Sequence, residues 1–352
     1  MRLTIFRIFV TFKFLKNALI EIVFPMLDMF EQIKNPVKDE FKCFDKAYEK
    51  ALSTSNPVLS EIYANIKNNK GKQLRPILAL LCAKAIGVVS ENTIKTAVIL
   101  ELLHNVSLIH DDVVDEAEMR RGKPSVNKVF GNKIAVLSGD YLLAQIFEHT
   151  ADIDDKRIVC AYSQLGKDLS DGEILETITS SQVLKDVSKY IEIIQKKTAV
   201  LFSTSLYVGA LSSGNLQEEE AQKRREFGNY LGLCFQIKDD IFDYQADSKD
   251  IGKPVGADIL GKKVTLPVIC AYQNASKGDR RDVETRLLKQ HLDKEDVNFF
   301  LDFVRWNEGI QGAERRMEEF RKKAELLLDG FRPSDAIDSL KLVTHYIIDR
   351  KS

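Results

Sequence analysis

Apolar residues recur at spacings of three and four along almost the whole chain from residue 29 onward. This period is typical of α-helices that bury one face. Only 18 Gly and 8 Pro occur among 352 residues, and so few breakers favour long helices over many short strands. No strand-like alternation of useful length and no Gly/Ser/Pro-rich linker is present in the sequence. The sequence therefore predicts an all-α protein with one large helical domain over residues 29–352.

Two predicted helices carry an Asp-Asp-x-x-Asp motif directly after an apolar run, at Asp111–Asp115 and at Asp239–Asp243. Helical spacing places the first and last aspartate of each motif one turn apart on one face. Such carboxylates suit Mg²⁺, which is typically held by one or two of them together with substrate phosphates. A solvated acidic face would not follow a buried stripe so abruptly in two copies. The pair of motifs therefore predicts a Mg²⁺-dependent diphosphate site.

Cations lie near both motifs in the sequence. Lys197 is flanked by apolar residues on both sides, which is unusual for a solvated lysine. His104 lies seven residues before Asp111 and so shares its helix face. Arg and Lys are the common ligands of phosphate groups. The remaining candidates for phosphate binding are Lys72, Arg75, Arg120, Arg121 and Lys253.

The overall charge excludes a broad basic surface. Lys plus Arg number 51 and Asp plus Glu number 52, so nothing indicates a nucleic-acid partner, and any anion site must be local. The five cysteines form no Cys-x-x-Cys pair, and four of them lie among apolar residues. This favours free, buried thiols in a reducing cytoplasm.

The first 28 residues are apolar and basic, and Arg2, Arg7, Lys13 and Lys16 interrupt them too often for a membrane-spanning helix. Three interpretations stay open: an interfacial amphipathic segment, a targeting signal, or an extension outside the fold, with the domain starting near Met26 or Met29. We assign residues 1–28 to an N-terminal extension outside the fold.

Two stretches resemble a known family: LLHNVSLIHDDVVDEAEMRRGKPSVN (residues 102–127) and GLCFQIKDDIFDYQADSKDIGKPVGADIL (residues 232–260). Over residues 30–352 the chain is similar to all-trans isoprenyl diphosphate synthases of the medium- and long-chain type, such as octaprenyl and solanesyl diphosphate synthases. The resemblance implies an isoprenoid synthase-type bundle of long antiparallel helices around a deep central cavity, a prenyltransferase activity and a homodimer. It also implies isopentenyl diphosphate and an allylic diphosphate, farnesyl or similar, as substrates.

The resemblance assigns roles to the candidate residues. Those implied to bind isopentenyl diphosphate are Lys72, Arg75, His104 and Arg121. Those implied to hold Mg²⁺ are Asp111, Asp115, Asp239 and Asp243. Those implied to hold the allylic diphosphate are Arg120, Lys197, Thr198, Gln236 and Lys253. Those expected to act most directly in catalysis are Asp111, Asp115, Lys197 and Asp239.

Two departures from the family pattern stand out. Lys70 takes the place of one of two glycines before Lys72, and in Gly261-Lys262-Lys263 the usual glycine has moved one place. The second departure leaves the conformation of that loop open.

Product length is expected to depend on the helix that ends in the first motif. Val106 and Ser107 lie about one turn before Asp111, where short-chain family members typically carry an aromatic ring. Smaller side chains there predict products longer than farnesyl and geranylgeranyl diphosphate, and a transient membrane contact when the product is released.

Two rival functions remain. A class I terpene cyclase would share the acidic motifs, but it needs no second diphosphate site. An inactive regulatory subunit of a heteromeric synthase would usually lack one of the motifs.

Overall fold

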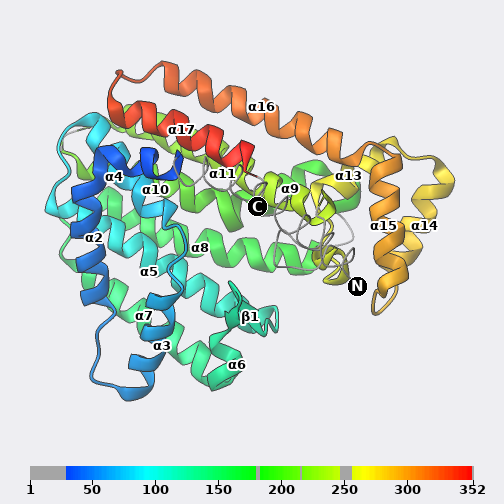
Figure 1. Ribbon diagram of the computed structural model, residues 1–352, viewed down its shortest axis with the longest axis horizontal. Coiled ribbons are helices and arrows are strands. Elements are labelled where there is room, and N and C mark those ends of the chain that lie inside the picture. Colours follow the sequence, from blue (N-terminus) through cyan, green and yellow to red (C-terminus); the bar gives the residue numbers. More distant parts are fainter. Residues whose placement is uncertain (1–28, 180–182, 215, 246–255, 351–352) are drawn as a thin grey trace, which may run out of the picture.

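The computed structural model describes residues 29–179, 183–214, 216–245 and 256–350. Within them the predicted all-α fold is confirmed, apart from one short hairpin, in which β1 (Met119–Arg120) pairs antiparallel with β2 (Lys123–Pro124) (Figure 1). The assigned extension, residues 1–28, lies outside the described residues, as does Lys253.

Long helices make up most of the described chain. Their bounds are α2 Lys38–Ala51, α3 Pro57–Asn68, α4 Leu74–Ile86, α5 Glu91–Val114, α6 Val126–Phe130, α7 Asn132–Ala151, α8 Lys156–Thr179, α9 Val187–Ile194, α10 Val200–Ser212, α11 Glu218–Gln245, α12 Ala257–Leu260, α13 Leu266–Asn274, α14 Lys277–Leu287, α15 Lys294–Trp306, α16 Gly309–Asp329 and α17 Asp335–Asp349. Single turns of 3₁₀-helix span Asn35–Val37 and Val183–Lys185, and a π-helical turn spans Gln195–Ala199.

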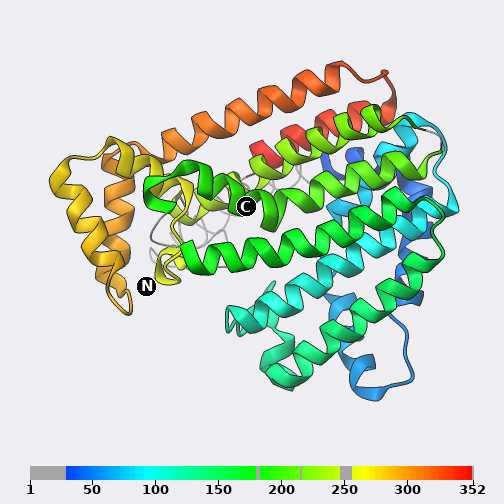
Figure 2. The ribbon, with the colours of Figure 1, turned by 180° about the vertical axis from the view of Figure 1, so that it is seen from behind.

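The bundle is built around α10, in which every residue is buried. Helices α4, α5, α8 and α11 pack around it (Figures 1 and 2). A helix that is apolar on all sides must be covered on all sides, which explains its central place. Gly209 permits the close contact with α4, because a Cβ there would lie 2.4 Å from the backbone oxygen of Ala79.

Local signals set the ends of α4 and α5. Helix α4 ends just before Gly87, and α5 begins at Glu91, with Ser90 as its N-cap. The Ser90 side chain accepts a hydrogen bond from the Thr93 N–H, and the Thr93 side chain completes the capping box. Because Ser90 caps the 24-residue helix α5, its position fixes where the other end of the helix, with the first acidic motif, comes to lie.

A smaller hydrophobic cluster joins α13 and α15 at one end of the molecule, beside the main core. Helix α17 runs back along α11 and α4, so that Arg350 lies close to the second acidic motif. The prediction of four buried thiols is wrong in part, because only Cys82 and Cys234 are buried, whereas Cys43 and Cys160 are exposed. Apolar neighbours in sequence do not decide which face of a helix a side chain occupies. No helix among the described residues is long and apolar enough to cross a membrane.

Candidate active site

Both acidic motifs lie at the C-terminal ends of their helices. Asp111 is in the last turn of α5, Asp115 caps that helix, and Asp239 and Asp243 lie in the last two turns of α11. The negative pole of a helix dipole disfavours carboxylates there and favours a cation. Burial, and next the charge of Glu173, raise the pKa of Asp111 to about 6, although Lys197 opposes this. The arrangement of the first motif therefore suits a bound cation.

The aspartates of the second motif already have protein partners. Asp239 is paired with Arg350 at 2.6 Å. The buried Asp240 accepts hydrogen bonds from Tyr190 Oη (2.5 Å) and Gln236 Nε2 (2.8 Å). Asp243 accepts the backbone N–H groups of Ala257 and Asp258 at the start of α12.

In the described part of the chain, no three His, Cys, Asp or Glu side chains converge as a preformed metal cluster. A Mg²⁺ ion that shares its ligands with substrate phosphates needs only one or two carboxylates. The helix end with Asp111 and Asp115 provides them, so the residues present fit that ion.

Lys197 lies on the π-helical turn between α9 and α10, a type of irregularity that is frequent at functional sites. Its ammonium group pairs with Glu173 (2.7 Å) and Glu176 (2.5 Å) of α8. Burial by itself would lower the pKa of Lys197, but the two glutamates more than offset this and raise it. Lys197 therefore stays charged, and its position is fixed.

Thr198 and Gln236, two of the residues expected to hold the allylic diphosphate, are hydrogen-bonded to each other. Thr198 Oγ1 donates to Gln236 Oε1 (2.6 Å), which in turn orients the Gln236 amide toward Asp240. Arg120, by contrast, has its guanidinium paired with Asp112, the buried second aspartate of the first motif, with Nε at 2.9 Å. This ion pair therefore holds the Arg120 guanidinium against α5.

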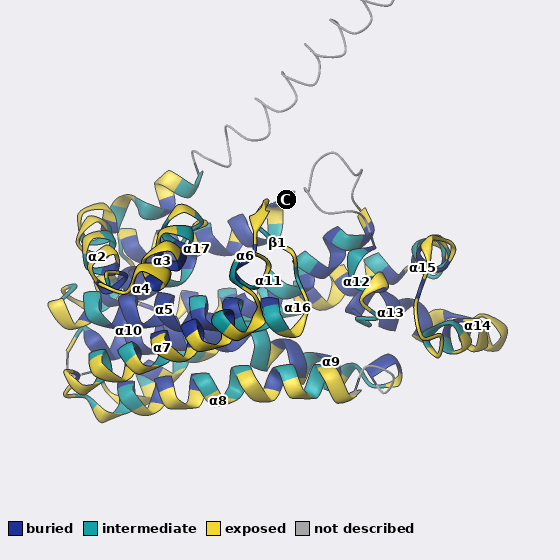
Figure 3. Ribbon diagram, turned by 90° about the horizontal axis from the view of Figure 1, so that it is seen from below, coloured by how far each residue is buried: buried dark blue, intermediate teal, exposed yellow. Residues whose placement is uncertain are grey.

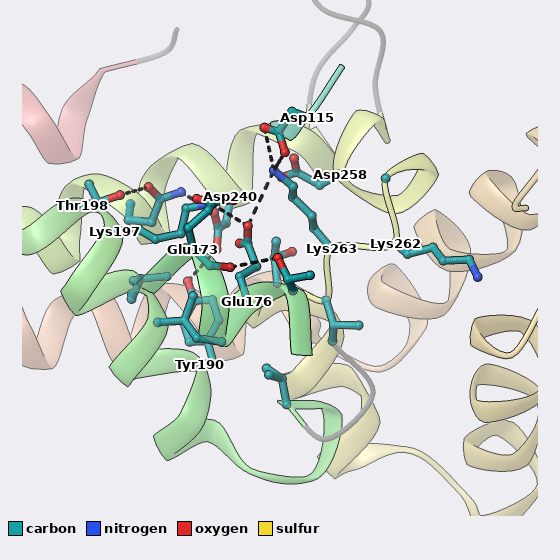
Figure 4. A pocket seen from close by; sticks show the side chains of 18 of the residues that line it. Asp115, Glu173, Glu176, Tyr190, Lys197, Thr198, Asp240, Asp258, Lys262 and Lys263 are labelled. Atoms are coloured by element: carbon teal, nitrogen blue, oxygen red, sulfur yellow. Dashed lines mark hydrogen bonds and ion pairs between the residues drawn. The ribbon is translucent and has the colours of Figure 1, made fainter. Parts of the chain in front are cut away.

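A cavity of about 490 Å³ lies between these elements (Figure 4). Its charged lining consists of five acidic side chains and three lysines: Asp115, Glu173, Glu176, Asp240, Asp258, Lys197, Lys262 and Lys263. Lys263 points toward Asp115 (3.3 Å) and Glu176 (3.8 Å), whereas Lys262 points away. The cavity carries an excess of negative charge.

The residues predicted to bind isopentenyl diphosphate form a second group. Arg75 Nη1 donates to His104 Nε2 at 3.0 Å. Arg121 donates to the backbone oxygen of Asn69 and packs on Gly71, where a Cβ would lie 2.7 Å from the guanidinium carbon. Gly71 has a φ of +60°, which favours glycine. Lys72 lies exposed over the Tyr346 ring, 5.2 Å from its centroid.

Sequence reasoning missed several residues of the site: Glu173, Glu176, Tyr190, Asp240, Asp258, Lys263 and Arg350. The sequence carried one signal for Lys263, because in Gly261-Lys262-Lys263 the glycine stands one place from its usual position in the family. Lys262 adopts a φ of +56°, so a lysine occupies a left-handed conformation that glycine would adopt without strain. The glutamates of α8 and the terminal Arg350 have no comparable signal, since only the fold brings them to the cavity.

Comparison with known proteins identifies the family. A family model described as "Polyprenyl synthetase" matches residues 56–304, more than half of the chain. The chain belongs to this family. The chain is similar to the all-trans-nonaprenyl-diphosphate synthase (geranyl-diphosphate specific) of Rhodobacter capsulatus, with 34% identity over 261 residues. The aligned region covers 74% of this chain and 79% of the relative.

Solved structures agree with the family assignment. A decaprenyl diphosphate synthase from Rhodobacter capsulatus superposes with a TM-score of 0.85 at 27% identity, covering 91% of this chain and 98% of that one. A geranylgeranyl pyrophosphate synthase from Corynebacterium glutamicum, complexed with calcium and isoprenyl diphosphate, gives a TM-score of 0.77 at 28% identity, covering 89% and 95%. The family and fold predicted from the sequence are confirmed, and this polyprenyl synthetase is a prenyltransferase.

Proposed function

We propose that this polyprenyl synthetase is an all-trans polyprenyl diphosphate synthase that uses Mg²⁺ to join isopentenyl diphosphate to an allylic diphosphate, such as farnesyl diphosphate. One observation carries the proposal. An acidic cavity with Lys197 and Lys263 is accompanied by a separate group of cationic side chains, Lys72, Arg75 and Arg121. An acidic, metal-accepting site and a separate site of cationic side chains suit two diphosphates that must meet.

The charge of the cavity supports the metal requirement. Because carboxylates outnumber lysines there, a diphosphate would be repelled unless divalent cations came with it. When bound, Mg²⁺ supplies positive charge that neutralises the leaving diphosphate. We assign its carboxylate ligands to Asp111, Asp115, Asp239 and Asp243. To bind the ion, Asp239 would give up its ion pair with Arg350, and Asp243 would give up its hydrogen bonds to the start of α12.

The side chains of the cavity support the ionisation of the allylic substrate. Lys197 and Lys263 place fixed positive charge where the C1–O bond breaks and its electron pair passes to the diphosphate. The Thr198 hydroxyl and the Gln236 amide can orient the same group. The double bond of isopentenyl diphosphate, held by Lys72, Arg75, His104 and Arg121, then forms the new carbon–carbon bond. The adduct loses a proton to the released diphosphate.

Product length is the second part of the proposal. We propose a medium- or long-chain product, octaprenyl-like in size, because Val106 and Ser107 leave α5 without an aromatic ring near Asp111. The similarity to nonaprenyl and decaprenyl synthases supports this. We place the enzyme in the cytoplasm, with transient membrane contact as the apolar product leaves.

We also propose that two copies form a homodimer through α7. This helix exposes large apolar side chains, with Val136 39%, Leu137 53%, Tyr141 44% and Phe147 70% exposed. Figure 3 shows exposed segments along α7, and helical spacing places these four side chains on one broad face, which also carries the exposed Asp140 and Glu148. Large exposed apolar side chains grouped on one helix in this way support a protein interface.

Binding of each substrate class with and without metal tests the central proposal. A non-hydrolysable farnesyl diphosphate analogue should bind with Mg²⁺ and lose nearly all affinity in EDTA. Isopentenyl diphosphate should bind in both conditions, because its proposed site supplies the cations Lys72, Arg75 and Arg121 and needs no metal. Equal binding of the analogue in EDTA would overturn the metal assignment.

A turnover assay separates the rival functions. Purified protein alone, with Mg²⁺, farnesyl diphosphate and radiolabelled isopentenyl diphosphate, should release labelled polyprenyl diphosphates. Turnover of the allylic substrate without isopentenyl diphosphate would favour a cyclase. Activity only after a second protein is added would favour a regulatory subunit.

A further inference from the structure

One aspartate of the second acidic motif turns inward, and its partner Tyr190 has no role in the proposed mechanism. Asp240 and Tyr190 are each only 3% exposed. Carboxylates are almost never buried to this degree unless they are paired or hydrogen-bonded. Asp240 Oδ2 accepts the Tyr190 hydroxyl at 2.5 Å, and its Oδ1 accepts Gln236 Nε2 at 2.8 Å. Both oxygens of this carboxylate are therefore bonded to protein.

The second aspartate of the first motif is buried to the same degree. Asp112 is also 3% exposed, and its carboxylate pairs with the Arg120 guanidinium. In both motifs, then, the second aspartate is bonded to protein side chains, whereas the outer aspartates are the proposed metal ligands. The hydrogen bonds of Asp240 therefore point to a role other than metal binding, and its neighbours indicate which role.

Asp240 determines which way the Gln236 amide faces. A carboxylate oxygen accepts hydrogen bonds, so the amide nitrogen must lie on the side of Asp240. The amide oxygen is then left to accept the Thr198 hydroxyl, at 2.6 Å. The amide nitrogen carries a second hydrogen, which can be donated to a phosphate oxygen in the cavity that Gln236 and Thr198 line. The orientation of Gln236 therefore determines which groups an allylic diphosphate meets there.

Three hydrogen bonds in series join three elements beside the cavity (Figure 4). Tyr190 comes from α9, Thr198 from the π-helical turn, and Gln236 and Asp240 from one turn of α11. Because Gln236 and Asp240 share a face of one helix, their own hydrogen bond leaves the two side chains free to turn together. Tyr190 bonds to the carboxylate from a different element and so fixes that pair.

We propose that Tyr190 is a positioning residue for the allylic diphosphate: its hydroxyl fixes the Asp240 carboxylate, which holds the Gln236 amide with one N–H toward the substrate. The inference rests on the proposed function, in which Gln236 and Thr198 hold that diphosphate. A buried, fully bonded network of this kind keeps binding groups in one geometry before the ligand arrives. The Tyr190 hydroxyl acts through Asp240 and not by contact with either substrate.

Tyr190→Phe tests the inference, because it removes one oxygen atom and keeps the ring. With Mg²⁺ present, isothermal titration of the non-hydrolysable farnesyl diphosphate analogue should give a Kd about tenfold higher than wild type. A buried acceptor then loses its donor, and Gln236 is no longer fixed. The Kd of isopentenyl diphosphate should change less than about twofold. An unchanged Kd for the analogue in the folded variant overturns the inference.

Tyr162→Phe is the matched control. Tyr162 is 4% exposed, and its hydroxyl donates to the backbone oxygen of Thr96 at 2.9 Å, so this change also removes one buried hydrogen bond. Both variants should lower Tm by a similar amount, but Tyr162→Phe should leave the Kd of the analogue unchanged. An equal rise of that Kd in both variants would indicate a general loss of rigidity and would also overturn the inference.

A double-mutant cycle separates the inference from the function on which it rests. Gln236→Ala should raise the Kd of the analogue, and adding Tyr190→Phe should raise it by less than about a further twofold, because both changes break the same chain of hydrogen bonds. A further rise of about tenfold would show that Tyr190 acts independently of Gln236, and would remove the inference alone. An unchanged Kd in Gln236→Ala would remove Gln236 from the allylic site, and the role of Tyr190 with it.

Discussion

At the scale of single residues, the ionised carboxylate of Asp111 lowers the stability of the folded protein when no metal is bound. Asp111 has a pKa of about 6, against about 3.9 for an ordinary aspartate. Between these values the folded chain keeps a proton that the unfolded chain has lost. The free energy of unfolding therefore falls as pH rises from about 4 through 6. The folded protein is less stable above pH 6 because it keeps a buried carboxylate that can bind a cation. Such a loss of stability is common at functional sites.

Asp111→Asn tests this exchange. Without metal, the variant should be more stable than wild type by about 1–3 kcal/mol at pH 8 and nearly equal to it at pH 4. Its turnover should fall by orders of magnitude, because a proposed metal ligand is lost. Urea unfolding at both pH values measures the first effect. Asp115→Asn, an exposed site, is the control: its turnover should also fall, but its stability should change by less than about 0.5 kcal/mol. A less stable Asp111→Asn at pH 8 would contradict the argument.

The left-handed Lys262 gives a second prediction at this scale. A lysine at a φ of +56° carries about 1 kcal/mol of backbone strain. Lys262→Gly should relieve it and raise the free energy of unfolding by up to about 1 kcal/mol, because the gain is partly offset by the greater freedom of glycine in the unfolded chain. Lys262→Ala removes the side-chain contact to the Lys289 backbone while keeping the strain. Chemical denaturation should rank the glycine variant above the alanine variant, and the reverse order would contradict the strain.

At the scale of elements, α5 carries both the acidic motif and the residues expected to limit product length. Val106 is only 5% exposed and belongs to the main core, whereas Ser107 is half-buried and lies one turn before Asp111 on the same face. The two positions therefore differ in how much they can be enlarged without disturbing the packing of the helix.

Phenylalanine at each position tests the role of α5 in product length. Ser107→Phe should shorten the product and keep the rate of the first condensation, with little loss of stability. Val106→Phe should also shorten the product but should cost about 1–3 kcal/mol of stability, because it overpacks the core. Chromatography of the products and thermal unfolding give the two readouts. An unchanged length distribution in both variants would show that this face of α5 does not limit the chain.

At the scale of the whole molecule, the exposed face of α7 predicts the assembly. Replacing Tyr141 by Lys together with Phe147 by Glu should convert the dimer to a monomer, because charges are then buried at the interface. Light scattering after size exclusion measures the mass. Leu326→Glu, at a 74% exposed position on α16, should leave the dimer intact. A monomeric wild-type protein would contradict the proposed interface.

The sequence by itself determined the helical class, the family and the two acidic motifs. Each depends on local spacing: a helical period of 3.6 residues, or two aspartates one turn apart after an apolar run. It also singled out Arg75 and His104, whose hydrogen bond the structure contains.

Only the tertiary structure decided which charges balance one another. Lys197 meets Glu176 across 21 residues, Asp115 meets Lys263 across 148, and Asp239 meets Arg350 at the far end of the chain. No periodic pattern links such pairs, because each partner is placed by the packing of its own helix.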